Sequence, residues 1–108
     1  MLNLLEHLNS IKVANEELGK LLNQSYPGTD QRLLSQALGL CDRMYSRDSY
    51  IQEKVGKIRR WLVIYFDHKK CFRQENGGEN KVHYEINVLQ SLINDQLDYI
   101  ISRVPAED

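Results

Sequence analysis

The chain has 108 residues, 42% hydrophobic and 27% charged, which is the size and composition of one globular domain with its own core. Its formal net charge of −1 excludes a strong overall field that would draw it to nucleic acid or to an acidic membrane. The longest apolar run, 61–66, is far too short to span a bilayer. The first residues show no signal-peptide pattern, and Cys41 and Cys71 lack CxxC spacing. We therefore expect a cytoplasmic protein with no membrane association, whose thiols are buried and reduced.

Two amphipathic helices are predicted in the first half of the chain. Apolar residues recur at helical spacing over 4–23 and again over 30–45. A proline–glycine pair between these ranges favours a tight turn, and Thr29 or Asp30 can cap the second helix.

The third predicted helix covers 50–73 and contains the most apolar stretch of the chain. Ser49 and Gln52 have the spacing of a capping box at its start. Seven apolar residues share one face and are predicted to point into the core: Ile51, Val55, Ile58, Leu62, Tyr65, Phe66 and Phe72.

A fourth helix is predicted over 81–103, after a polar loop at 74–80 that contains two glycines. Its apolar residues follow steps of three and four, and Pro105 ends the pattern. No segment shows the two-residue alternation of a strand. Because short connections between long amphipathic helices favour antiparallel neighbours, we predict one all-α domain over 1–108, an antiparallel up-down four-helix bundle.

The third helix carries a second row of residues that one core face does not require. The row follows helical spacing about 100° or more away from the core face, and it consists of Lys57, Trp61, Ile64, His68 and Cys71. The helix is therefore either central and packed on two neighbours, or it presents a surface to a partner or to a second copy. Tryptophan anchors with neighbouring cations are favoured at interfaces, so we predict a partner-binding site at Lys57, Arg60, Trp61, Ile64 and His68.

The basic charge of this region supports a second hypothesis. Residues 54–81 contain eight Lys or Arg against three Asp or Glu, a net charge of +5, whereas 82–108 have a net charge of −4. Four cations are candidates for contacts with a phosphate backbone: Lys57, Arg59, Arg60 and Lys70. They are spread around most of the helix, and no nucleic-acid recognition motif accompanies them, so nucleic acid is the less favoured partner.

The motifs of catalysis and of cofactor binding are missing. His68 and Cys71 supply two metal ligands at most, while a stable metal site needs three or four. The glycine pair at 77–78 has no downstream Gly-Lys-Ser/Thr, and no serine or cysteine lies in a nucleophile motif. We predict no enzyme activity, no cofactor and no metal. The expectation is a small interaction module of the regulator, inhibitor, immunity-protein or chaperone type, which binds a protein partner or itself.

Overall fold

The computed structural model describes residues 4–24, 30–71 and 77–104, and these residues form helices and connections without a strand. The helices are α1 (Leu4–Asn23), α2 (Gln31–Asp42), α3 (Ser49–Tyr65), the single turn α4 (His68–Cys71) and α5 (Gly78–Ser102). The predicted all-α class is therefore confirmed.

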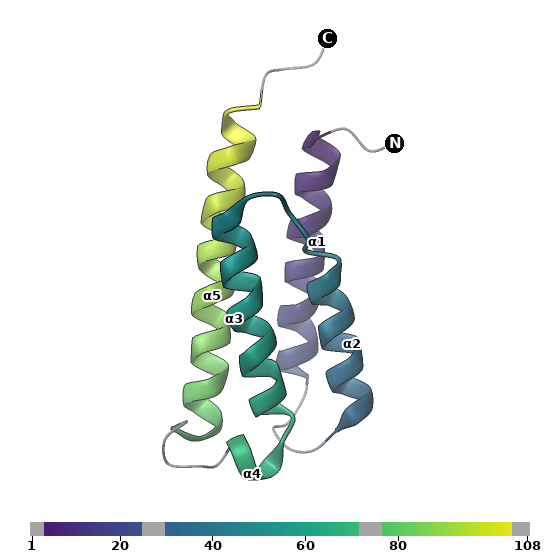
Figure 1. The fold of residues 1–108 in the computed structure, drawn as a ribbon, viewed down its shortest axis with the longest axis vertical. Coiled ribbons are helices and arrows are strands. Elements are labelled where there is room, and N and C mark those ends of the chain that lie inside the picture. The colour runs from purple at the N-terminus through teal and green to yellow at the C-terminus, as the bar shows by residue number, and fades with distance from the viewer. Residues whose placement is uncertain (1–3, 25–29, 72–76, 105–108) are drawn as a thin grey trace.

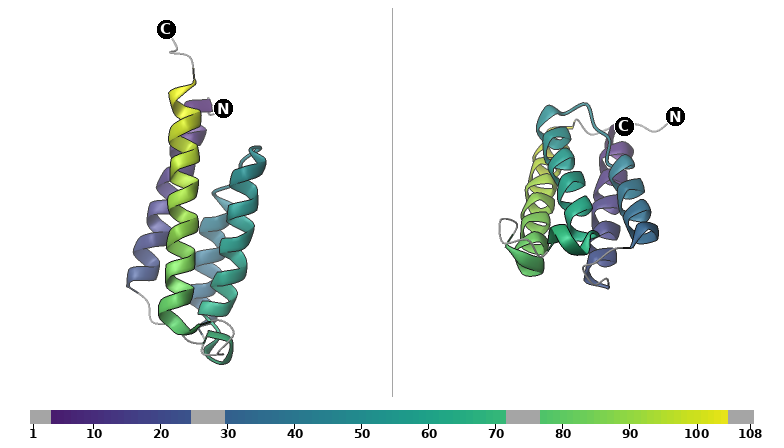
Figure 2. Two further views of the ribbon diagram at one scale, coloured as in Figure 1. Left: turned by 90° about the vertical axis from the view of Figure 1, so that its left-hand side faces the viewer. Right: turned by 60° about the horizontal axis from the view of Figure 1, so that its bottom comes forward.

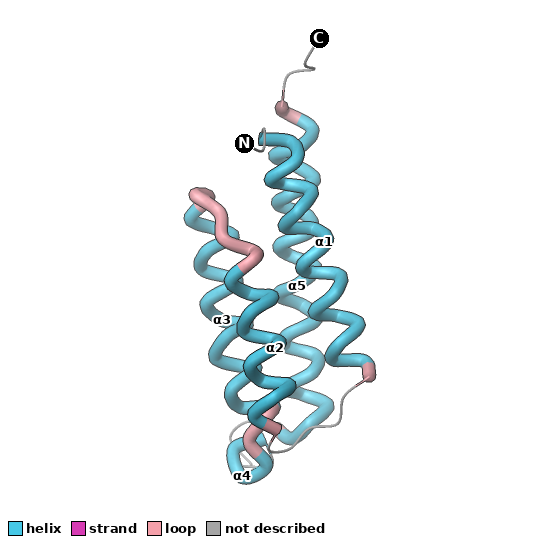
Figure 3. Tube along the Cα trace, turned by 90° about the vertical axis from the view of Figure 1, so that its right-hand side faces the viewer, coloured by secondary structure: helices cyan, strands magenta, loops and turns pink. Residues whose placement is uncertain are grey.

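The four long helices lie side by side in an elongated molecule with principal extents of 53 × 24 × 20 Å. Each of them packs on two others: α1 on α2 and α5, and α3 on α2 and α5. Successive long helices run in opposite directions, as Figure 1 and the side and end views of Figure 2 show. The short α4 packs on α3 and α5 at one end, while α1 and α5 project beyond the α2–α3 connection at the other end (Figure 3).

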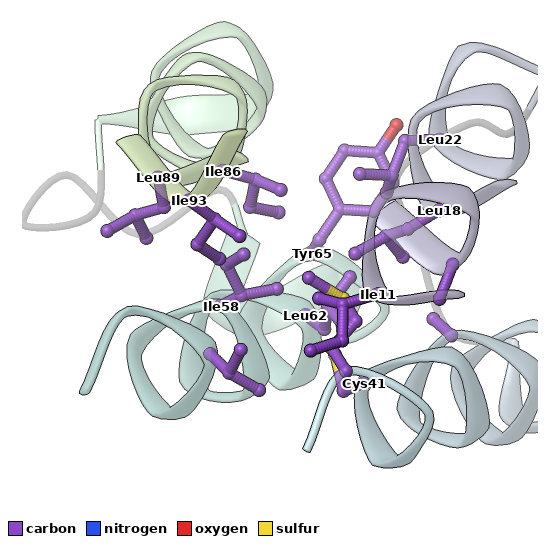
Figure 4. Packing of buried hydrophobic residues seen from close by; sticks show 14 of the residues in the cluster. Ile11, Leu18, Leu22, Cys41, Ile58, Leu62, Tyr65, Ile86, Leu89 and Ile93 are labelled. Atoms are coloured by element: carbon purple, nitrogen blue, oxygen red, sulfur yellow. The ribbon is translucent and has the colours of Figure 1, made fainter. Parts of the chain in front are cut away.

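The core is built from the apolar stripe of each long helix. Leu18 and Leu22 of α1 approach Tyr65, and Ile58 of α3 faces Ile86 and Ile93 of α5 (Figure 4). The predicted core face of α3 is confirmed over six residues, all at most 4% exposed: Ile51, Val55, Ile58, Leu62, Tyr65 and Phe66. The seventh, Phe72, lies outside the described residues.

The boundaries of three helices are close to those predicted. The first helix spans Leu4–Asn23 as expected. The second ends at Asp42, three residues early, and Asp30 caps its start by accepting a hydrogen bond from the Leu33 N–H at 3.0 Å. The last begins at Gly78, three residues early, after Gly77 adopts a φ of 78°.

The prediction of one helix over 50–73 is wrong, because α3 ends at Tyr65. Phe66 leaves the helical conformation with φ −93° and ψ 27° while its side chain is 1% exposed. Asp67 then starts α4, since its carboxylate accepts a hydrogen bond from the Lys70 N–H at 3.1 Å. Burial of the Phe66 ring and this new cap together turn the chain where local periodicity predicts a continuous helix.

The predicted capping box at the start of α3 is also wrong. Ser49 is the first helical residue, and the N-cap is Asp48. One Asp48 carboxylate oxygen accepts from the Ile51 N–H at 3.0 Å, and the other accepts from the Gln96 side-chain amide of α5 at 3.2 Å. The Asp48 carboxylate is a better N-cap here than the predicted Ser49 hydroxyl, because it caps α3 and also hydrogen-bonds to α5.

Two buried amides connect α1 to α5. The Asn15 side-chain NH₂ donates to the Gln90 carbonyl at 3.1 Å and to Asn94 Oδ1 at 3.0 Å. The Gln90 NH₂ in turn donates to the Asn15 carbonyl at 2.9 Å and to Asn15 Oδ1 at 3.0 Å. Because buried polar groups are costly unless paired, this reciprocal contact favours one register of α1 against α5.

The first testable prediction concerns this amide pair. We expect Gln90→Leu alone to lower the free energy of unfolding by about 1–3 kcal/mol, since it leaves Asn15 Oδ1 buried without its donor. Asn15→Leu should cost a similar amount. The double variant should be more stable than the sum of the single losses predicts, because both amides are then replaced by apolar groups. Urea unfolding of the four proteins measures the cycle, and strictly additive losses would show that the two amides are not coupled.

Both cysteines are buried, as the sequence predicts. Burial raises the pKa of the Cys41 thiol to about 11, so very little reactive thiolate is present near neutral pH. Cys71 lies in α4 and is 0% exposed. The two residues serve as small apolar side chains of the core, Cys41 in the last turn of α2 and Cys71 at the end of α4.

Candidate protein interface

Four of the five residues predicted for partner binding lie together on α3. Lys57, Arg60, Trp61 and Ile64 line a shallow pocket of about 300 Å³ on a side of the helix next to its buried core face. We call this set the outer face of α3. Steps of three and four place these residues within two turns of one another, so their proximity follows from helical geometry.

Trp61 and Ile64 are partly buried, and both pack against the edge of the core. The sequence allows two explanations of this row, packing between neighbouring helices or contact with a partner. Partial burial agrees fully with neither, because neither side chain is completely buried and neither is fully exposed to solvent. The indole N–H of Trp61 has no hydrogen-bond partner within the described part of the chain. A half-buried tryptophan of this kind is held in position by the core while it keeps a surface and a donor for another molecule.

The outer face of α3 is bordered by positive charge. Lys57 forms an ion pair with Glu53 one turn earlier, with 3.2 Å between Nζ and Oε1. The hydrogen bond from Lys57, together with the charge of Lys54, holds the pKa of Glu53 below its usual value. Arg60 is exposed and has no ion-pair partner among the residues that the structure describes. Arg60 is thus the cation of this face that is available to a partner's carboxylate.

His68, the fifth predicted residue, does not continue the row on α3. The helix ends before it, and His68 is the first residue of α4, on the far side of the turn at Phe66 and Asp67. Its side chain is outside the part of the structure that is described. Cys71, which completes the row in the sequence, is a core residue. The continuous row therefore ends at Ile64.

The four cations of the nucleic-acid hypothesis are not brought together. Arg59 forms an ion pair with Asp42 and lies toward α2, on a different side of α3 from Lys57 and Arg60. Lys70 belongs to α4 and donates its backbone N–H to Asp67. Only two of the four cations, Lys57 and Arg60, share one surface.

None of the helices in the described part of the chain has the length and apolar character needed to cross a bilayer. The described residues also contain no group of three or more His, Cys, Asp or Glu side chains arranged to hold a metal ion.

Two features of the site were missed by sequence reasoning. Glu53 is part of the charge pattern through its pair with Lys57, and the four-residue spacing within the predicted helix was a sufficient signal. The row of residues on α3 cannot continue past Asp67, because Asp67 caps the start of α4. Aspartate is common at N-caps, and this preference was the signal in the sequence for the turn.

Comparisons with protein-family models, with curated proteins and with solved structures find no match to this chain. We therefore infer its function from the geometry and chemistry of its own residues.

Proposed function

We propose that this protein is a non-catalytic interaction module that binds a protein partner through the outer face of α3. In this proposal the chain is an antiparallel up-down four-helix bundle, closed at one end by α4, and it acts in the cytoplasm. The observation that carries the proposal is the half-buried Trp61, set beside Ile64 and flanked by Lys57 and Arg60. Tryptophan and arginine are the residue types most often found to dominate the energy of protein interfaces.

The chemistry of this face favours a different protein over a second copy. Lys57, Arg60 and the Trp61 indole N–H are all donors, so the complementary surface carries carboxylates or carbonyl oxygens around an apolar centre. A two-fold contact centred on Trp61 would place the same cations of both copies in one interface, where like charges repel. The separation of Arg59 and Lys70 from this face leaves two cations, which favours a compact protein contact over a track along a phosphate backbone.

The test begins with the solution mass of the reduced protein, measured by light scattering after size exclusion. We expect a mass near the 12.7 kDa of one chain. Immobilised wild type and Trp61→Ala are then compared in capture from an extract of the source cells. The matched control is Val63→Ala, because Val63 is 38% exposed on the same helix but does not line the pocket.

A protein retained by wild type and by Val63→Ala, but lost from Trp61→Ala, supports the proposal. A stable dimer that Trp61→Ala converts to a monomer would assign the face to self-association and contradict a separate partner at this site. Equal capture by all three proteins would contradict the site itself. Retention of nucleic acid that disappears as salt is raised would favour the nucleic-acid hypothesis.

A further inference from the structure

A large pocket lies at the end of the molecule opposite α4. Its volume is about 680 Å³, and it opens where α1 and α5 project beyond the α2–α3 connection (Figure 3). Leu4 and Leu8 of α1 and Ile100 of α5 provide its apolar wall. We call it the end pocket. Its volume is in the range of small-molecule sites, about 300–1,000 Å³.

Two of the polar residues that line the end pocket, Ser46 and Asp48, already form hydrogen bonds within the protein. Both oxygens of the Asp48 carboxylate accept hydrogen bonds, from the Ile51 N–H at 3.0 Å and from the Gln96 amide at 3.2 Å. The Ser46 hydroxyl oxygen accepts from the Asp48 N–H at 3.1 Å, and Ser46 is buried. These hydrogen bonds hold the α2–α3 connection in place, while the Asp48 carboxylate keeps its negative charge and the Ser46 hydroxyl can still donate.

The other polar residues of the pocket are His7, Tyr45 and Arg47. Within the described part of the chain none of these three side chains has a hydrogen-bond or ion-pair partner. Arg47 always carries its positive charge, Tyr45 can donate through its hydroxyl, and His7 through a ring nitrogen. All three of these side chains can therefore donate a hydrogen bond, and the permanent charge among them is the positive charge of Arg47.

We infer that the end pocket binds a small amphipathic carboxylate, with its apolar body against Leu4, Leu8 and Ile100 and its carboxylate at Arg47. Guanidinium and carboxylate groups form strong, geometrically matched hydrogen bonds, and Tyr45 and His7 are the additional donors at the rim. The inference is independent of the proposed interface, because the end pocket shares no lining residue with the outer face of α3.

The experiment uses three ten-carbon probes that differ in their head group: decanoate, decanol and decylamine. Each is titrated below its aggregation limit into protein labelled at the Ile and Leu methyl groups, and binding is followed by NMR. We expect decanoate to shift the methyl signals of Leu4, Leu8 and Ile100 while the signal of Ile64 stays in place. Decanol should bind about tenfold more weakly or worse, because the charged contact is missing.

Arg47→Gln should weaken decanoate by about tenfold and leave decanol unchanged, since it removes one charge-assisted contact. Arg32→Gln is the matched control, because Arg32 is exposed near the opposite end of α2. Trp61→Ala should leave decanoate binding intact, which separates this test from that of the interface. Decanoate that shifts none of the pocket methyls at millimolar concentration would overturn the inference. Decylamine that binds as tightly as decanoate, or full decanoate affinity in Arg47→Gln, would overturn it as well.

Discussion

Replacing Phe66 with alanine is expected to lower the free energy of unfolding by about 4 kcal/mol, the middle of the usual range for a buried phenylalanine. The ring is 1% exposed and lies edge-on to Tyr65, with 5.0 Å between the ring centroids. The substitution removes apolar contacts and this aromatic pair at the residue where the chain turns from α3 into α4. Urea or thermal unfolding followed by circular dichroism measures the loss.

Phe66→Leu is the matched control for this prediction. It keeps most of the apolar volume but loses the ring contact with Tyr65, so a smaller loss of about 1–2 kcal/mol is expected. If Phe66→Ala cost less than about 1 kcal/mol, the ring would not be part of the core, and the account of why α3 ends at Tyr65 would fail.

Trp61→Ala is expected to weaken association with the captured partner by about 2 kcal/mol or more, which is roughly a thirtyfold rise in Kd. The indole is the largest apolar group on the outer face of α3, and its removal also uncovers the neighbouring Ile64. Isothermal titration calorimetry of the two proteins against the partner measures the change. Because Trp61 is only partly buried, we expect unfolding stability to fall by about 1–2 kcal/mol, less than for Phe66→Ala.

Two controls separate binding from folding in this experiment. Trp61→Phe keeps an aromatic ring but loses the indole N–H, so it should retain part of the affinity. Arg60→Glu reverses an exposed charge, and its effect on affinity should diminish as salt is added. A Trp61→Ala protein that is unfolded, with a folded Trp61→Phe that binds as tightly as wild type, would identify Trp61 as a core residue without a role in binding.

Much of the fold and part of the site follow from local patterns in the sequence. Apolar spacing predicts the four long helices and the core face of α3, because an amphipathic helix can bury only the stripe that recurs every three or four residues. The proximity of Lys57, Arg60, Trp61 and Ile64 was predictable for the same reason, since all four lie on one continuous helix. The buried state of both cysteines also agrees with the prediction made from their lack of CxxC spacing.

Tertiary structure decided the features that depend on residues far apart in the chain. Helical periodicity predicts that the Phe66 ring is buried, but it does not predict that the backbone of Phe66 leaves the helical conformation, so that α3 ends at Tyr65 and Asp67 caps α4. The pairing of Asn15 with Gln90 joins residues 75 positions apart, and each residue alone is an ordinary polar position on a helix. The end pocket exists because α1 and α5 project beyond the α2–α3 connection, so it depends on how four helices of different length align. Helical periodicity determines which face of a helix is buried, but contacts between helices determine where each one ends and what its exposed residues meet.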